Sequence, residues 1–353
     1  MRHLQSYVGL TVFSAIVMVL LVILGLDALS AVIDNLQDMK GDFGFSEVLF
    51  YVLLTLPRKL TEYLPFAALV GCLAGLGSMA NNSELVVMRA AGLSTGRLVW
   101  LVMRPTFVLI FAGMLITEYV APPAEQYAET RKTIKQHGNQ TFNLERGLWN
   151  RDGNEFMHFN VVQSGGVING LKVFSFDQNR KLEQVMTARR ATYQEEGFWV
   201  VEKARIDSVT DAKISRQKFP SYRWNSGLTP RMLEIVAINP DQLSITALWR
   251  AAQYRLEQGL DANSFMLEFW RKILTPLGTA SLVLIGISFI FGPLREVTMG
   301  YRIFTGVIVG IVFRTTQDLL GPASLVFNFQ PIYSVIVPIG ICLAVGIVLL
   351  RRA

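Results

Sequence analysis

The sequence is poor in charged residues and in cysteine. Charged residues make up 17% of the 353 positions, whereas soluble domains average about 25%. Hydrophobic residues account for 51%, and the mean hydropathy is +0.37. The two cysteines, Cys72 and Cys342, both lie inside apolar runs, which argues against a disulfide framework. This composition predicts a membrane protein, in which the formal charge of +6 orients the spans rather than binding nucleic acid.

Motifs for catalysis and metal binding are missing as well. No G-x-x-x-x-G-K-[ST] loop occurs, so the chain cannot hydrolyse a nucleotide in the P-loop manner. His3, His137 and His158 do not cluster with cysteine or carboxylates at metal-ligand spacing. No serine or cysteine stands in a nucleophile-elbow context. We therefore predict no catalytic site, no metal site and no cofactor in this chain.

Long apolar runs predict six membrane spans. The first is too long for a signal-peptide core and is followed by no A-x-A site, so we interpret it as a retained span. The second apolar region, 47–80, exceeds one crossing of about 20 residues. Because Pro57-Arg58-Lys59 and Pro65 interrupt it, we expect an interfacial half (48–56), a charged kink and a true span. The predicted spans are 7–32, 63–80, 98–120, 269–291, 303–319 and 332–350.

The middle of the chain has a different pattern. Between residues 121 and 264 no run is long enough to cross a membrane, and short β-branched and aromatic stretches alternate with turn signals. Their spacing of roughly 8–12 residues is typical of a β-sandwich or barrel. A helix near 241–258 then leads back to the membrane. The predicted fold is an α-helical membrane protein with an inserted all-β domain, divided into 1–120, 121–264 and 265–353. The expected strands are 156–162, 167–176, 185–193, 198–206 and 213–224.

Basic residues orient this arrangement. Six spans place both termini on one side, and three spans before the insert place the β domain on the other. The opposite short loops hold Lys40 among several acids, and Asp318 with no base nearby. By the positive-inside rule, the termini are cytoplasmic and the β domain is extracytoplasmic. The cytoplasmic side carries Arg2, Arg89, Arg97, Arg295, Arg302, Arg351 and Arg352.

A short amphipathic segment, 82–94, separates the second and third spans. Ser83 stands at the N-cap position, and Glu84 lies in the first turn, where negative charge suits the helix dipole. Gly92 occupies the place of a C-terminal capping glycine. We expect a two- to three-turn helix on the cytoplasmic membrane surface, on which a partner outside the membrane can act.

Charged residues near the membrane leave two interpretations open. Arg58, Lys59 and Glu62 lie where the second apolar region reaches the outer interface. They are either snorkelling anchors or, together with Lys132 and Lys135, a basic collar for an anionic amphiphile.

Three carboxylates lie within or near other spans. Asp27 and Asp34 are either proton-relay carboxylates or, as we favour, partners of cations on neighbouring helices. Arg314 and Asp318 are four residues apart and are expected to form a local ion pair.

Several segments resemble the LptF/LptG family of lipopolysaccharide-export ABC permeases. The segment Ser83–Gly92 is similar to the cytoplasmic coupling helix of that family, and its residues Glu-Leu-Val-Val-Met resemble the LptG branch more closely. The similarity extends over essentially the whole chain. Further matching segments are Glu118–Pro122, Gly147–Gly153, Phe291–Arg295, Met299–Arg302 and Gly321-Pro322.

The resemblance implies a fold, partners and a substrate. Members have six transmembrane helices and a periplasmic β-jellyroll. LptG-like and LptF-like subunits pair on a dimer of the ATPase LptB, which carries ATP and magnesium, and the single-span protein LptC joins them. The complex extracts lipopolysaccharide from the inner membrane of Gram-negative bacteria. It passes the lipid to a periplasmic jellyroll bridge that leads to the outer membrane.

The resemblance also implies site residues. Glu84 corresponds to the acid that meets the ATPase, and its neighbours Ser83, Arg89 and Gly92 complete the expected coupling site. Arg58 corresponds to a basic residue facing lipid phosphates, beside Lys59, and Tyr63 to an aromatic cavity residue. Lys132 matches one of two cations beyond the third span, but Glu129 replaces the other. Some members carry a lysine pair after the first span, where this chain has Gln37-Asp38 with Lys40 nearby.

We therefore predict a non-enzymatic permease subunit of a lipopolysaccharide exporter. One alternative is an ion-coupled secondary transporter that works through Asp27 and Asp34. Another is a mechanical transmitter that uses ATP to move its outer domain without transport. The surface coupling helix argues against the first alternative, and the wide apolar portion with a basic outer rim argues against the second.

Overall fold

The computed structural model describes most of the chain. The described residues are 2–39, 42–137, 148–152, 154–163, 167–177, 181–194, 197–210, 213–227, 239–257, 261–292 and 297–352.

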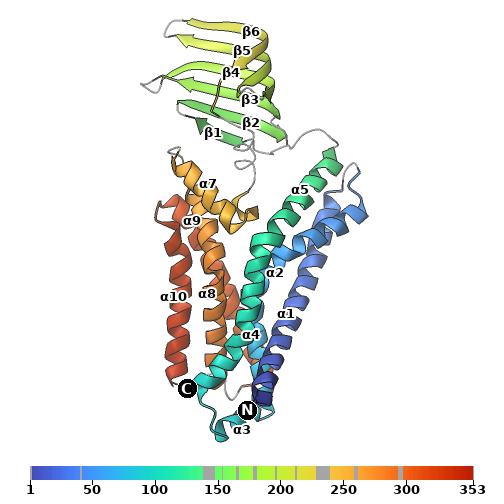
Figure 1. Cartoon of the computed structure of the whole chain (residues 1–353), viewed down its shortest axis with the longest axis vertical. Helices are drawn as coiled ribbons and strands as arrows, with labels where there is room; N and C mark the ends of the chain where they lie inside the picture. Colours follow the sequence, from blue (N-terminus) through green and yellow to red (C-terminus); the bar gives the residue numbers. More distant parts are fainter. Residues whose placement is uncertain are drawn as a thin grey trace.

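Long apolar helices build the membrane portion. In the described part of the chain, six helices are long and apolar enough to cross a bilayer, which confirms the predicted number. Figure 1 shows the two termini at one end of this bundle and the β-sheet at the other. The helices are α1 (Arg2–Gln37), α2 (Phe45–Asn81), α4 (Thr95–Leu115), α8 (Asn263–Phe291), α9 (Met299–Val326) and α10 (Pro331–Arg352).

The second apolar region is one continuous helix. The predicted interfacial half, kink and span all belong to α2, which passes through Pro57 and Pro65. Proline removes one backbone donor and bends a helix without having to end it. Figure 1 shows the first half of α2 running obliquely before the helix turns along the bundle.

The third span is longer than predicted. We expected it to end near Val120, before Pro122-Pro123, but α4 continues through a π-helical turn, η1 (Ile116–Val120), into α5 (Ala121–His137). A π-turn shifts the hydrogen-bond register by one residue. The prolines follow this shift directly, at a place where their missing N–H groups interrupt little. Residues 121–137 therefore belong to a helix rather than to the β domain.

Glycine allows the first two helices to pack closely. A Cβ atom at Gly71 of α2 would lie 2.4 Å from the Cα atom of Ile16 on α1. On α9, a Cβ atom at Gly310 would lie 2.4 Å from the ring of Phe66. Small residues at such contacts let helix backbones approach within a membrane. These contacts place α2 between α1 and α9, at the centre of the bundle.

The inserted domain is an antiparallel sheet of six described strands. Its strands follow one another in chain order, so the described part is a meander without crossing connections. The predicted all-β insert is confirmed, with β1 as an additional strand. The strands are β1 (Leu148–Asp152), β2 (Glu155–Gln163), β3 (Val167–Phe176), β4 (Leu182–Tyr193), β5 (Trp199–Thr210) and β6 (Lys213–Trp224).

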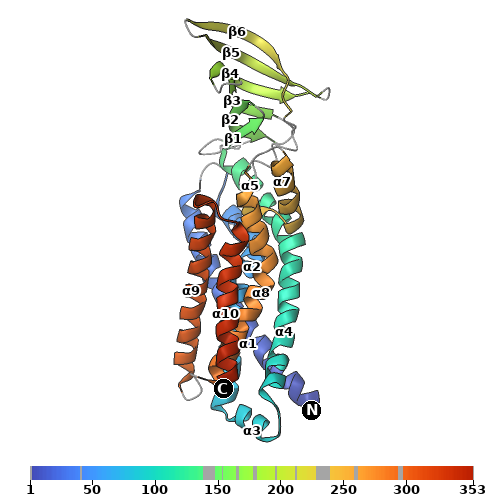
Figure 2. The same ribbon diagram turned by 90° about the vertical axis from the view of Figure 1, so that its left-hand side faces the viewer.

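Backbone irregularities bend this sheet around its own core. Ile168 and Leu171 are both buried although they are three residues apart, and Gly170 between them has a φ of +68°. On β5, Val201 and Ala204 are buried in the same way around Lys203, whose φ is +52°. At both places one left-handed residue interrupts the alternation of side chains, while the pairing register of the neighbouring strands is the same before and after it. The sheet curves as a result (Figure 2).

Residues 239–257 are a described part of the connection that returns the chain from the sheet to the membrane. This part begins with the turn η2 (Pro240–Gln242) and continues as α7 (Ile245–Glu257), which confirms the predicted helix with a later start. Buried Leu248 and Ala252 of α7 pack in one cluster with Phe265 and Phe269 of α8. This cluster fixes α7 on the outer end of α8.

Candidate functional site

The short helix α3 (Glu84–Ala90) links α2 to α4 at the end of the bundle that carries the termini (Figures 1 and 2). Leu85 and Met88 are buried in the main core, whereas Val86 and Val87 are exposed. One face of α3 is therefore anchored to the bundle and the other is open to a partner.

The ends of α3 differ from expectation at one residue. Ser83 precedes the helix as predicted, but its φ is +59° and its side chain makes no capping bond. Only two residues separate α2 from α3, and the sharp turn between them requires this left-handed conformation. Gly92, with a φ of +88°, confirms the predicted C-terminal glycine. The Gly92 and Leu93 amides donate to the carbonyl oxygens of Arg89 and Met88, which is a Schellman motif.

Only one of the two carboxylate oxygens of Glu84 accepts hydrogen bonds from the described residues. Its Oε1 atom accepts hydrogen bonds from Tyr7 Oη at 3.3 Å and Asn82 Nδ2 at 3.4 Å. Its Oε2 atom is shielded from solvent and has no hydrogen-bond partner among the described residues. A shielded carboxylate oxygen without a donor is costly. Arg89 lies on the same helix, 6.0 Å from the Phe291 ring centre.

A buried arginine joins α9 to the end of α2. Arg302 is 2% exposed and donates to the carbonyl oxygen of Gly77 and to Asn81 Oδ1, both at 3.0 Å. Gly77 and Asn81 lie in the last turns of α2, directly before α3. Arg302 therefore connects α9 to the end of α2 that directly precedes α3.

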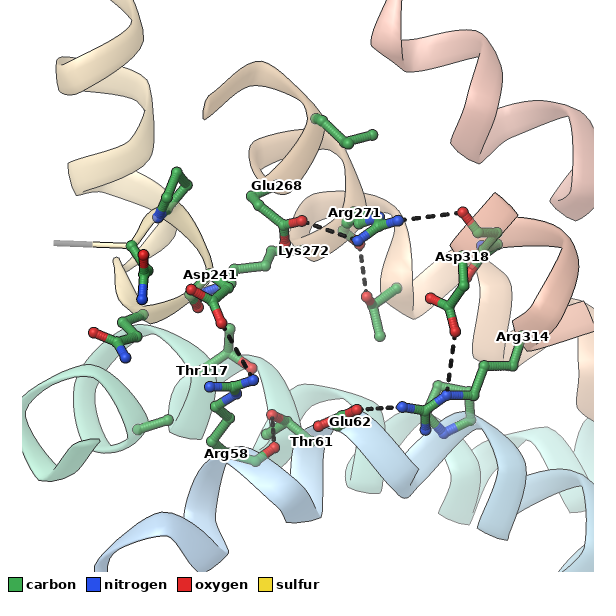
Figure 3. A pocket seen from close by; sticks show the side chains of 18 of the residues that line it. Arg58, Thr61, Glu62, Thr117, Asp241, Glu268, Arg271, Lys272, Arg314 and Asp318 are labelled. Atoms are coloured by element: carbon green, nitrogen blue, oxygen red, sulfur yellow. Dashed lines mark hydrogen bonds and ion pairs between the residues drawn. The ribbon is translucent and has the colours of Figure 1, made fainter. Parts of the chain in front are cut away.

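A charged cavity lies at the other end of the bundle. It has a volume of about 700 Å³ and is lined by α2, η1, α5, η2, α8 and α9. Figure 3 shows charged side chains from α2, η2, α8 and α9 pointing into it. Cations and carboxylates alternate around its wall, so the cavity is polar rather than simply basic. The charged lining residues are Arg58, Arg271, Lys272, Arg314, Glu62, Glu125, Asp241, Glu268 and Asp318.

Arg58 is the predicted lipid-binding residue that enters this cavity. Its Nη1 atom pairs with Glu125 of α5, and its Nη2 atom lies 3.3 Å from Asp241 Oδ2 of η2. The guanidinium group therefore bridges two carboxylates and is not an isolated anchor.

Lys59 and Tyr63 face the first helix instead. Tyr63 Oη donates to Asp27 Oδ1 at 2.5 Å, and Lys59 Nζ lies 3.9 Å from the same oxygen. The preferred interpretation of Asp27, a partner for a neighbouring cation, is thereby confirmed. Asp34 is exposed, and no ion pair is found for it among the described residues.

Arg314 links the fifth span to the second. Its Nε atom lies 3.6 Å from Asp318 Oδ2, as the four-residue spacing predicts, and its Nη2 atom pairs with Glu62 of α2. Arg314 also lies over the Tyr63 ring, 5.4 Å from its centre.

Lys132 is separate from the cavity. It lies seven residues beyond Glu125 on α5, about two helical turns away, and donates to Asn35 Oδ1 at 2.8 Å and Asp38 Oδ2 at 2.9 Å. We expected Arg58, Lys59 and Lys132 to form one basic collar. In the structure each of them binds different partners. Glu129, which replaces the second cation that the resemblance implies, accepts a hydrogen bond from Tyr51. Lys40 lies outside the described residues.

Some site residues escaped the sequence analysis. Lys272 and Arg271 fall within the first residues of the predicted fourth span, and ionisable residues inside a span are a recognised signal of function. Asp241 and Glu125 lie in polar surroundings, where no such signal exists. In the described ranges no group of three or more potential metal ligands occurs.

Comparison with known proteins assigns the chain to a family. A model of the lipopolysaccharide export system permeases LptF/LptG matches residues 6–352. The permease protein LptG of Escherichia coli K12 is 34% identical over 352 residues, covering 99% of this chain and 98% of that protein. LptG of Haemophilus influenzae is 32% identical over 337 residues, covering 95% and 94%. With its six membrane helices and inserted β-sheet, the chain belongs to the LptF/LptG family of lipopolysaccharide export permeases.

Proposed function

We propose that this chain is the LptG-type transmembrane subunit of an ABC exporter. The exporter takes lipopolysaccharide from the inner membrane and passes it to a periplasmic jellyroll bridge. The observation that carries the proposal is the similarity to LptG proteins over nearly the full length of both chains. The partners are an LptF-like permease, an LptB-like ATPase dimer that holds ATP and magnesium, and an LptC-like single-span protein.

Coupling to the ATPase takes place at α3. The exposed Val86 and Val87 offer apolar contact, and Glu84 Oε2 offers a shielded acceptor to a donor on the partner. A push on α3 reaches α4 through the connection Ala91–Ser94, and it reaches α9 through Arg302. Movement of the helices then changes the shape of the space in which the lipid lies.

Substrate binding uses the outer end of the bundle. Arg58 presents two guanidinium N–H groups at the cavity, and arginine binds phosphate through such forked contacts. The acyl chains of a glycolipid gain free energy from contact with apolar helix faces. Neither step needs covalent chemistry in this chain.

The ion-coupled alternative has less support. A proton relay needs a carboxylate that changes its charge during the cycle, but Asp27 is engaged by Tyr63 and Lys59.

Reconstitution of the whole complex tests the proposed function. The chain is purified with its co-expressed LptF-like, LptB-like and LptC-like partners and placed in liposomes with lipopolysaccharide. We expect ATP-dependent transfer of the lipid to a soluble jellyroll acceptor carrying a photocrosslinker. Mass spectrometry of lipid bound to the complex should identify lipopolysaccharide. Transfer without ATP, or a different bound lipid, would contradict the proposal.

Thiol labelling tests the orientation. Ser221 on β6 and Ser94, which follows α3 and precedes α4, are both exposed. The elements β6 and α3 lie at opposite ends of the molecule (Figure 1). In cells with a permeabilised outer membrane, Ser221→Cys should react with a membrane-impermeant reagent and Ser94→Cys should not. The reverse pattern would overturn the assignment of the β-sheet to the periplasm.

Charge reversal tests the lipid-binding residues. Arg58→Glu adds a third carboxylate beside Glu125 and Asp241, and Lys132→Glu adds one beside Asp38. Because the two sites are separate, their effects should add. The double variant should lose photocrosslinking to lipopolysaccharide far more than either single variant, with assembly intact.

A control variant places the same change outside the cavity. Arg250→Glu reverses an exposed charge on α7, and it should crosslink lipid as the parent does. If the double variant also crosslinks like the parent, Arg58 and Lys132 are interfacial anchors.

A further inference from the structure

The segment that returns the chain from the β-sheet to the membrane is tied to three membrane helices. We call Asn239–Thr246 the return segment; it comprises η2 and the start of α7. Side chains from η1, α8 and α2 each bind it. These contacts connect elements far apart in the sequence, and the proposed function assigns them no role.

Glu118 of the π-turn η1 caps the helix α7. Its Oε2 atom accepts a hydrogen bond from the Ile245 amide at 2.8 Å, and its Oε1 atom accepts one from Thr246 Oγ1 at 2.5 Å. The first N–H groups of a helix lack partners within the helix, and a carboxylate there also suits the helix dipole. Since η1 continues α4, the third span directly holds the start of α7.

Lys272 of α8 binds the backbone of the same segment. Its Nζ atom donates to the carbonyl oxygens of Asp241 at 2.7 Å and Leu243 at 2.6 Å. Among the described residues no carboxylate forms an ion pair with Lys272. Its hydrogen bonds thus go to the return segment and fix the position of Asp241.

Arg58 of α2 completes the connection and has two unequal partners. The Glu125 side chain is only 6% exposed, and the Asp241 side chain is 43% exposed at a distance of 3.3 Å. A phosphate monoester carries several acceptor oxygens and binds the guanidinium fork well. An anion that enters the cavity therefore replaces the more exposed and more distant carboxylate, which is Asp241.

We propose that Glu118 and Lys272 are positioning residues that hold Asp241 against Arg58, and that a phosphomonoester headgroup at Arg58 displaces Asp241 and loosens the return segment. This inference rests on the proposed function, because it takes the headgroup of the exported glycolipid as the displacing anion. It links occupation of the cavity to the mobility of the chain that carries the β-sheet. The loaded and empty states thereby differ in how firmly the β-sheet is attached.

Hydrogen–deuterium exchange of the amides of residues 243–250 tests the proposal. The complete complex is placed in nanodiscs of phosphatidylcholine, with or without phosphatidic acid, whose headgroup is a phosphomonoester. In the parent, phosphatidic acid should accelerate exchange about fivefold, since one charge-assisted bond is lost. Inorganic phosphate in solution forms a second arm. An equal acceleration there supports the same chemistry and shows that the acyl chains are not required.

Variants separate the switch from a structural role. Asp241→Asn keeps the backbone carbonyl that Lys272 binds but loses the charge, so exchange should be fast in both lipids. Asp241→Glu should restore the slow exchange and the response to phosphatidic acid. Glu118→Ala should accelerate the basal exchange, because the Ile245 amide loses its acceptor. Asp207→Asn is the matched control: Asp207 pairs with Arg205 and Arg216 on the sheet, and its loss should change neither rate nor response.

Three results would overturn the proposal. The first is equal exchange in both lipids for the parent, and the second is an unchanged lipid response in Asp241→Asn. The third is an equal response to phosphatidylserine, which would assign the effect to general surface charge. Transfer of lipopolysaccharide is measured on the same samples. If transfer is normal and the exchange response is absent, only the displacement of Asp241 fails, whereas absent transfer by the parent removes the proposed function.

Discussion

Glu84→Ala is expected to weaken association with the ATPase or to uncouple ATP hydrolysis from lipid transfer, while the permease remains in the membrane. Tyr7 and Asn82 orient the carboxylate through hydrogen bonds to Oε1. Its Oε2 atom has no hydrogen-bond donor among the described residues, so a donor on the ATPase can bind it. Loss of a buried charged contact at an interface costs about 2–5 kcal/mol. Co-purification of the ATPase and the ratio of ATP hydrolysed to lipid transferred measure the effect.

Two further variants separate charge from position in this prediction. Glu84→Gln keeps the shape of the side chain but loses its charge, so it should retain assembly only in part. Tyr7→Phe removes one bond that orients Glu84 and should have a smaller effect. Glu183→Ala, an exposed acid on the β-sheet, should match the parent. Normal assembly and coupling in Glu84→Ala would show that the contact with the ATPase lies elsewhere.

Gly71→Ala is expected to destabilise the helix bundle strongly, although it adds only one methyl group. The new Cβ atom would lie 2.4 Å from Ile16 Cα and 2.8 Å from Ile16 N, both backbone atoms. Backbone cannot rotate away as a side chain can, so α1 has to move as a body. Overpacking of this kind typically costs about 1–3 kcal/mol. The melting temperature of the purified protein should fall clearly.

Gly9 of α1 supplies the matched control. A Cβ atom at Gly9 would meet nothing within 4 Å, and alanine favours the helix over glycine by about 1 kcal/mol in water. Gly9→Ala should therefore leave the melting temperature unchanged or raise it slightly. Equal melting temperatures for the two variants would show that α1 and α2 do not depend on contact at Gly71.

The helix contacts explain why some predictions were incomplete. The sequence marks Pro122-Pro123 as a stop, yet the third span continues because the π-turn η1 precedes the prolines. It marks Pro57-Arg58-Lys59 as a kink between two segments, yet α2 is continuous. A proline signals a missing hydrogen bond, but the surrounding register and packing determine whether the helix ends there.

The candidate site was predicted in part. The short helix with Glu84 and Gly92 could be located because capping residues and apolar spacing are local signals. The partners of Arg58 could not, since Glu125 and Asp241 lie 67 and 183 positions further along the chain. Lys132 was grouped with Arg58 on charge, approximate depth and the family resemblance, and the structure gives it different partners, Asn35 of α1 and Asp38 directly after that helix.

The sequence by itself determined the six spans, the β insert and the surface helix, and the positive-inside rule predicts their orientation from the same sequence. These features follow from hydropathy, charge and local spacing, which need no knowledge of which helix packs beside which. Only the tertiary structure decided that Arg58 bridges Glu125 and Asp241, that Glu118 caps α7, and that Arg302 joins α9 to α2. Each of these contacts joins residues far apart in the sequence, and only the packing of the helices against one another brings them within bonding distance.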